Sequence, residues 1–159
     1  GKKRSFCVQC GYIDYKNPLP VAAAVVPNSQ GEILLVRRAN HPMRGMWCLP
    51  CGFAEIDEEM SEAALRELEE ETGLLAEQCT LLDVSNSHNY FYGNLLMVSY
   101  LVHSTQGSLR PGDDAMDTRY FAIDDMPPLA FRSHEKALRL FRSRDIETGE
   151  DKGTGDKLA

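Results

Sequence analysis

The sequence predicts one mixed α/β or α+β domain in which helices pack on a β-sheet. Two observations set the scale, because 159 residues suit a single domain and 43% hydrophobic with 26% charged residues is typical of a globular protein. The third is the order of the elements, since strand-like runs alternate with helical segments along the chain.

The first half of the chain begins with a polar lead-in over residues 1–20, whose Asn17-Pro18-Leu19-Pro20 stretch excludes a helix. Strands are predicted at 21–26 and 33–36, on either side of a turn at Asn28-Ser29-Gln30-Gly31. Residues 39–53 are rich in Pro, Gly and Trp and are predicted to form a loop.

The second half contains two predicted helices. The first covers 61–72, with Ser61 as its N-cap and Gly73 as its stop, and the second covers 131–144, with Ser133 as a cap. Strands are expected at 80–84, 95–103 and 118–123. A polar, Gly-rich tail over 145–159 is predicted to be disordered, which leaves 21–144 as the folded domain.

Charge is concentrated in one segment. The whole chain has 24 acidic and 17 basic residues, yet residues 55–71 hold nine acids and one base, so the remaining 15 acids and 16 bases nearly balance. Concentrated like charge destabilises a fold unless a cation offsets it, so the segment predicts a cation site. The balance elsewhere argues against a nucleic-acid partner.

The chain has no apolar run of the roughly 20 residues that a membrane helix needs and no secretory leader, so no membrane association is expected. Its five cysteines are an odd number, which favours reduced thiols over a disulfide framework and predicts a cytoplasmic protein.

Three carboxylates share one face of the first predicted helix, because Glu67, Glu70 and Glu71 stand at i, i+3 and i+4. Arg66 can pair with Glu70 but cannot neutralise all three. Oxygen ligands without histidine suit Mg²⁺ or Mn²⁺ rather than a catalytic zinc. The alternative for such a helix is a solvated acidic surface.

A longer pattern favours the metal. Gly52 is followed after five residues by Glu58, after seven more by Arg66-Glu67-Leu68, then by Glu70-Glu71 and Gly73-Leu74. This resembles the Nudix box, Gly-x5-Glu-x7-Arg-Glu-U-x-Glu-Glu-x-Gly-U with U apolar, at every defined position.

The resemblance implies an α/β/α sandwich with a mixed sheet and a loop-helix-loop metal site that hydrolyses a nucleoside diphosphate linked to another group. By position, it makes Glu67, Glu70 and Glu71 metal ligands, with Glu67 or Glu70 as the base. The resemblance also implies that Arg66 orients a carboxylate, that Glu58 acts as a supporting acid, and that Gly52 lets the backbone turn. Cys51 is implied to bind a metal through its backbone carbonyl, at a position where many relatives have Gly or Ala. An additional loop acid is expected at Asp113-Asp114, with Asp114 favoured; a plain surface turn is the alternative.

Cys7-x-x-Cys10-Gly11 has the spacing of half a zinc site, since structural zinc needs four ligands. Together with Tyr15, Asn17 and Pro18, this segment resembles part of the zinc ribbon in the ADP-ribose, FAD and NADH pyrophosphatase-like branch of the Nudix family. Such a ribbon has two Cys-x-x-Cys turns, or knuckles, and the segment resembles the second. Either a first knuckle lies upstream of residue 1, which zinc would require, or the ribbon has decayed and both thiols are free. The stretch 119–134 supports the same branch, but the NADH-enzyme signature is missing from 85–92.

Substrate-binding candidates are aromatic and basic. Trp47, Tyr90, Phe91 and Tyr92 could stack on a base, and Arg37, Arg38 and Arg44 could contact phosphates. For Trp47 the favoured alternative is a packing role beside the metal loop.

The predicted function is therefore divalent-metal-dependent hydrolysis of ADP-ribose, FAD or a similar dinucleotide, with release of AMP. The alternatives are a nucleoside triphosphate sanitising hydrolase and a catalytically weak nucleotide sensor. The expected partner is a small nucleotide, and the resemblance adds a homodimer, because relatives often dimerise.

Overall fold

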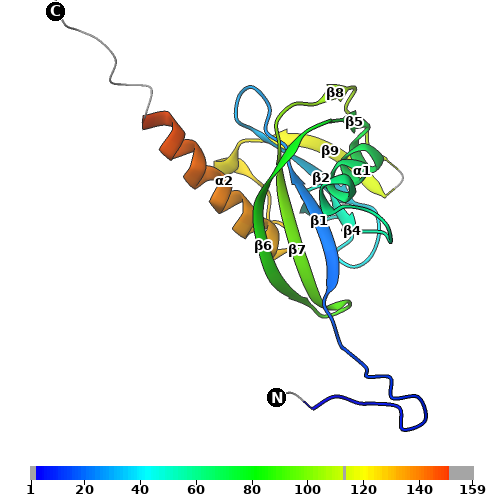
Figure 1. Cartoon of the computed structure of the whole chain (residues 1–159). Coiled ribbons are helices and arrows are strands. Elements are labelled where there is room, and N and C mark those ends of the chain that lie inside the picture. The colour runs from blue at the N-terminus through cyan, green and yellow to red at the C-terminus, as the bar shows by residue number, and fades with distance from the viewer. Residues whose placement is uncertain (1–2, 113, 151–159) are drawn as a thin grey trace, which may run out of the picture.

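A computed structural model describes residues 3–112 and 114–150 and places a curved set of strands between two helices (Figure 1). The main sheet is mixed, because β1 and β7 run parallel while its other pairs are antiparallel. Its strand order is β4 (Cys51–Phe53), β1 (Leu19–Val25), β7 (Gly93–Val102), β6 (Cys79–Asn89).

Two smaller antiparallel sheets complete the strands. One has the order β3 (Trp47–Cys48), β2 (Ile33–Arg38), β9 (Ala115–Phe121), and the other pairs β5 (Leu74–Leu75) with β8 (Gln106–Gly107). The expected single mixed sheet is therefore divided, and the two strands predicted around the turn at 28–31 enter different sheets. Asn28 Oδ1 stabilises that turn by accepting the N–H groups of Gln30 and Glu32, both at 3.0 Å.

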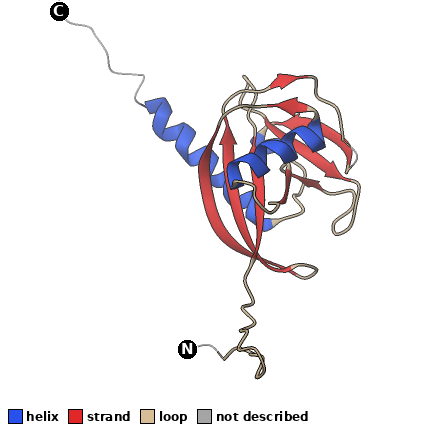
Figure 2. Cartoon of the chain, turned by 45° about the vertical axis from the view of Figure 1, so that its right-hand side comes forward, coloured by secondary structure: helices blue, strands red, loops and turns tan. Residues whose placement is uncertain are grey.

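Alternation along β1 explains why the helices lie on opposite sides of the strands (Figures 1 and 2). Ala24 packs in a cluster with Leu68 of α1 (Met60–Thr72), whereas Val25 packs with Ala137 and Phe141 of α2 (Arg132–Glu150). Small residues in β1 let both layers approach closely. The predicted α/β/α sandwich is confirmed.

The helix caps correct two sequence predictions and confirm a third. α1 begins one residue before Ser61, and its N-cap is Glu59, whose N–H donates to Glu62 Oε2 at 3.0 Å. Gly73 is the C-cap as predicted, with φ of +69° and its N–H on Glu69 O at 2.8 Å. Ser133 lies inside the first turn of α2 and does not cap it, since its buried Oγ has no partner among the described residues.

The other differences concern extents. The predicted loop 39–53 contains β3 and β4, and α2 continues to Glu150 instead of ending at 144. The prediction of a disordered tail is therefore wrong for 145–150, which are helical, and 151–159 lie outside the described residues. A short 3₁₀ helix, Ile123–Asp125, precedes α2.

Residues 3–18 form an exposed arm that projects from the body of the domain (Figures 1 and 2). Over the described ranges, no helix has the length and apolar character needed to cross a lipid bilayer.

Candidate metal centre and substrate pocket

The guanidinium of Arg66 is the centre of the acidic segment. Its Nε and Nη2 donate to the two carboxylate oxygens of Glu58 at 2.7 and 3.1 Å, and Nη2 also donates to the carbonyl of Phe53 at 3.1 Å. Nη1 donates to Glu67 Oε1 at 2.7 Å and to Glu70 Oε2 at 3.1 Å. All five N–H donors of the side chain therefore have acceptors. The hydrogen bonds to Glu58 contribute most to raising the pKa of Arg66, and Arg66 in turn lowers the pKa of Glu58.

Gly52 lies directly against the carboxylate of Glu67. A Cβ at position 52 would overlap that carboxylate, so any other residue there would displace the Glu67 side chain from its place beside Arg66. Burial raises the pKa of Glu67, and its contact with Arg66 opposes that rise.

Glu71 is the most enclosed carboxylate of the segment, with 7% of its surface exposed. Its Oε2 accepts the backbone N–H of Cys51 at 3.0 Å. Burial raises the pKa of Glu71 well above its usual range. Ala24 N–H donates to Pro50 O, so these two residues face each other as a hydrogen-bonded pair of the antiparallel ladder. In such a ladder the next residue along the strand, Cys51, directs both its N–H and its C=O away from β1. The Cys51 carbonyl consequently faces the same side as its N–H, toward α1.

This donor set fits a hard divalent cation. Glu67 and Glu70 approach each other closely enough to share one Arg66 nitrogen, while Glu71 accepts the N–H of Cys51, the residue next to the glycine that lies against Glu67. Oxygen atoms predominate, as Mg²⁺ and Mn²⁺ prefer. Within 3–112 and 114–150, no three His, Cys, Asp or Glu side chains already surround one point. A bound cation would therefore share Glu67 and Glu70 with Arg66.

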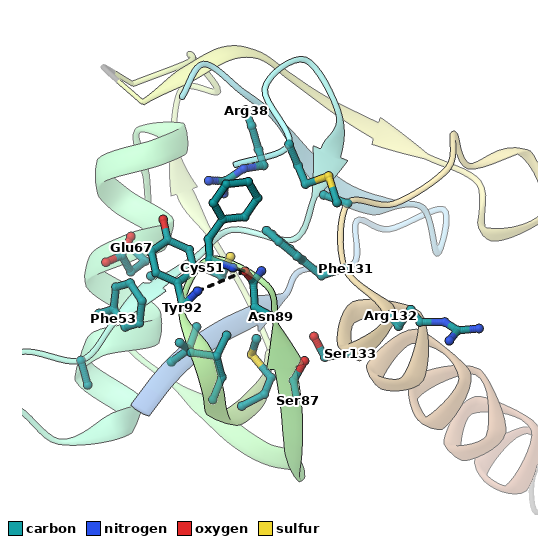
Figure 3. A pocket seen from close by; sticks show the side chains of 18 of the residues that line it. Arg38, Cys51, Phe53, Glu67, Ser87, Asn89, Tyr92, Phe131, Arg132 and Ser133 are labelled. Carbon is teal, nitrogen blue, oxygen red and sulfur yellow. Dashed lines mark hydrogen bonds between the residues drawn. The ribbon is translucent and has the colours of Figure 1, made fainter. Parts of the chain in front are cut away.

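The carboxylates occupy one end of a pocket of about 900 Å³. The β6–β7 hairpin and the first turn of α2 also line it, and Figure 3 shows Tyr92 and Asn89 between Glu67 and Ser133. Val21, Leu95 and Met97 make an apolar floor in this pocket. The pocket can accommodate a molecule whose phosphates lie beside α1 while another group reaches α2.

Some predicted substrate residues line this pocket. Arg38 does so while its Nε donates to Pro42 O at 2.8 Å and its guanidinium lies 5.2 Å from the ring centroid of Phe131. Tyr90 lines the mouth and is 94% exposed. The neighbouring Phe91 also lines the pocket, and Tyr92 lines it with its ring edge-on to Phe53 at 5.2 Å.

Three other predicted residues lie elsewhere. Arg44 and Trp47 are not among the residues that line the pocket. Trp47 packs edge-on against Phe121 with ring centroids 4.9 Å apart, as the packing alternative predicts. Arg37 donates through Nε to Gly45 O at 2.9 Å, which holds the loop before β3.

The predicted loop acid lies beside the helix. Asp114 lines the same pocket, and its Oδ1 accepts a hydrogen bond from Asn40 at 2.6 Å; Asp113 lies outside the described residues. The loop is attached to the end of α1, because Arg110 N–H donates to Thr72 O and Gly112 N–H donates to Glu71 O, at 2.9 and 3.0 Å.

Sequence reasoning missed the residues on the α2 side of the pocket, chiefly Phe131, Ser133 and Ser87, and it assigned nothing to His134. That histidine is fully buried, and its Nδ1 accepts the N–H of Leu49 at 3.1 Å. Burial, aided by the charge of Arg38, lowers the pKa of His134 to about 3. The neutral His134 ring on α2 thus holds the β3–β4 connection, which leads into the acidic segment.

The sandwich and its carboxylate helix define a divalent-metal hydrolase. A model of the NUDIX domain matches residues 17–141, and the chain belongs to the Nudix family of hydrolases, which generally need a divalent metal.

Two named relatives align with most of the domain. The ADP-ribose pyrophosphatase of Methanocaldococcus jannaschii is 36% identical over 120 residues, which span 75% of this chain and 70% of the archaeal protein. The 8-oxo-dGDP phosphatase NUDT18 of Mus musculus is 38% identical over 100 residues, 63% of this chain but 30% of the mouse protein.

A solved structure shares the fold. The NUDIX domain of Shewanella oneidensis NrtR, crystallised with ADP ribose, superposes with a TM-score of 0.72 at 27% identity, covering 82% of this chain and 90% of that one.

Replacing Arg66→Lys is expected to lower the free energy of unfolding by about 1–3 kcal/mol, because a single ammonium cannot serve the acceptors that the guanidinium fork serves. Urea denaturation followed by circular dichroism measures this. The matched control is Arg119→Lys, in an exposed pair with Asp117, where a change within about 0.5 kcal/mol is expected. Equal losses in both variants would contradict the role assigned to Arg66.

His134→Gln should flatten the pH dependence of stability between about pH 6.5 and 3. In that interval the unfolded chain protonates this histidine while the folded protein keeps it neutral, so stability falls as pH falls, by at most about 1.4 kcal/mol per pH unit. Glutamine can still accept the Leu49 N–H but does not titrate. Urea unfolding at a series of pH values tests this, and a curve for His134→Gln that runs parallel to that of the parent refutes it.

Proposed function

We propose that this chain hydrolyses the pyrophosphate bond of ADP-ribose, or of a similar dinucleotide such as FAD, and releases AMP. The observation that carries the proposal is the placement of Glu67, Glu70 and Glu71 beside Arg66 at one end of a pocket that continues to α2. The named activity of the archaeal relative and the ADP ribose in the Shewanella structure support this substrate class.

Glu67, Glu70, Glu71 and the Cys51 carbonyl are proposed to hold Mg²⁺ or Mn²⁺. When bound, such an ion reduces the charge repulsion between the phosphates and an incoming nucleophile and lowers the pKa of water. Arg66 orients the carboxylates of Glu67 and Glu70, and Glu58 fixes Arg66 from the loop.

The reaction needs a base as well as the ion. Glu67 or Glu70 accepts the proton of the attacking water, while Asp114 contributes a further carboxylate from the neighbouring loop. Water adds to one phosphorus, the bond from that phosphorus to the bridging oxygen breaks, and the bridging oxygen leaves on the other phosphate. The products are AMP and a phosphorylated partner, with the bound ion unchanged.

A second candidate is sanitising hydrolysis of a nucleotide, which the named activity of the mouse relative favours. The sensor alternative requires binding without turnover, and the complete carboxylate set argues against it.

Product analysis of the purified chain distinguishes these functions. With Mg²⁺ or Mn²⁺, we expect ADP-ribose to be hydrolysed to AMP at a higher kcat/KM than that for hydrolysis of FAD, NADH or a deoxynucleoside triphosphate, and we expect no product with EDTA. Preferential release of a nucleoside monophosphate from the triphosphate would support the sanitising function. Nucleotide binding without any product would establish the sensor and overturn the proposal.

Glu70→Gln is expected to lower kcat by about 10²-fold or more, because it removes an anionic ligand and a candidate base while preserving shape. The side chain is 60% exposed, so the fold should survive, as circular dichroism would show. Glu69→Gln, on the far side of the same helix from Glu67, is the control and should retain activity. Near-parental turnover of Glu70→Gln would exclude the proposed site.

A further inference from the structure

Cys48 and Cys51 lie at the two ends of the short β3–β4 connection. Only Leu49 and Pro50 separate them in the chain, and both cysteines are free thiols. Their side chains are within hydrogen-bonding reach of each other. The connection therefore folds back far enough to bring the two sulfurs together, although β3 and β4 belong to different sheets.

The two sulfurs differ in their access to solutes. Cys51 is partly exposed and lines the pocket, where Figure 3 draws its sulfur among the lining side chains. Cys48 is fully buried. A small oxidant in the pocket therefore contacts Cys51 first, and the oxidised sulfur already has a second thiol beside it.

Two neighbouring thiols are sufficient for a disulfide but not for a zinc site. Across residues 3–112 and 114–150, no third His, Cys, Asp or Glu side chain joins this pair around one point. A structural zinc needs four ligands, whereas a disulfide needs only two sulfurs whose side chains point toward each other. The pair is therefore better suited to oxidation than to metal binding.

We propose that a hydroperoxide oxidises Cys51 and that Cys48 then completes a reversible disulfide beside the pocket. With hydrogen peroxide, the Cys51 thiol attacks one oxygen, the O–O bond breaks, and a sulfenic acid and water form. The Cys48 thiol then attacks the Cys51 sulfur, an S–S bond forms, and the sulfenic oxygen leaves as water. The two thiols together lose two electrons and two protons, which the peroxide gains. A dithiol reverses the oxidation by thiol–disulfide exchange.

The disulfide would disturb the ion site beside it, a consequence that rests on the proposed function. The backbone of the connection is held from both helices, because Leu49 N–H donates to His134 Nδ1 at 3.1 Å and Cys51 N–H donates to Glu71 Oε2 at 3.0 Å. Joining the sulfurs brings them closer than hydrogen-bonding contact and pulls on this backbone. The reduced chain is therefore the form that keeps Cys51 against Glu71, and oxidation should weaken Mn²⁺ binding.

Peptide mass mapping of the full chain tests the disulfide. Trypsin cleaves after Arg44 and Arg66, so the peptide 45–66 contains both cysteines of the pair and no other cysteine. After hydrogen peroxide, the two sulfurs in this peptide should be joined and resist alkylation, and dithiothreitol should restore both thiols. In Cys48→Ala, Cys51 should stop at the sulfenic acid, which dimedone traps. Two thiols that remain alkylatable after peroxide, or a parent chain in which Cys51 ends as a sulfinic acid, would overturn the proposal.

Mn²⁺ binding, followed by electron paramagnetic resonance, tests the consequence for the ion site. The oxidised chain should bind Mn²⁺ about tenfold or more weakly than the reduced chain, and dithiothreitol should restore the affinity. Cys7→Ser/Cys10→Ser removes the two thiols of the arm as alternative targets and should respond like the parent. Equal affinity in both redox states would contradict the consequence. A reduced chain that binds no Mn²⁺ would instead contradict the proposed function, while the mapping of 45–66 would still decide the disulfide.

Discussion

The contact between one guanidinium and five acceptors is the constraint on which the proposed hydrolytic centre depends. Arg66 connects the loop before α1, through Glu58 and Phe53, to the helix itself, through Glu67 and Glu70. It thereby sets where the helix carboxylates lie relative to β4. One positive charge among so many carboxylates remains insufficient, and the remaining negative charge is what a divalent cation can satisfy. Arg66 thus organises the carboxylates without neutralising all of their charge.

The second helix supports the same loop from the other side of the strands. His134 accepts the N–H of Leu49, between Cys48 at the end of β3 and Cys51 at the start of β4. The Cys51 N–H is in turn bound by Glu71 of α1. The short β3–β4 connection is therefore held by both helices. A displacement of either helix would move the backbone at Leu49 or Cys51.

Sequence reasoning predicted best where partners are close in the chain. Gly73 was found as a helix stop because a left-handed C-cap has one preferred residue, whereas Glu59 was overlooked because a glutamate is a less common N-cap than serine. Strands of two or three residues, such as β3 and β4, are too short to show a period. The acceptor of Leu49 lies 85 residues away on α2, and no local pattern indicates such a pairing. Phe131 and Ser133 were missed for the same reason, since only the tertiary fold brings them to the pocket.

The locality of the Arg66 network has an evolutionary consequence. All of its partners, together with Gly52 and Glu71, lie between residues 52 and 71, so most of the proposed ion site can be inherited as one segment, with Cys51 directly before it and Asp114 on a separate loop. The pocket wall instead comes from β6, β7 and α2, which are far from that segment in the chain. Substitutions there can accumulate without disturbing the ion site, and a change of substrate need not pass through an inactive intermediate. Relatives that are named for different substrates, such as ADP-ribose and 8-oxo-dGDP, are the expected result of this separation.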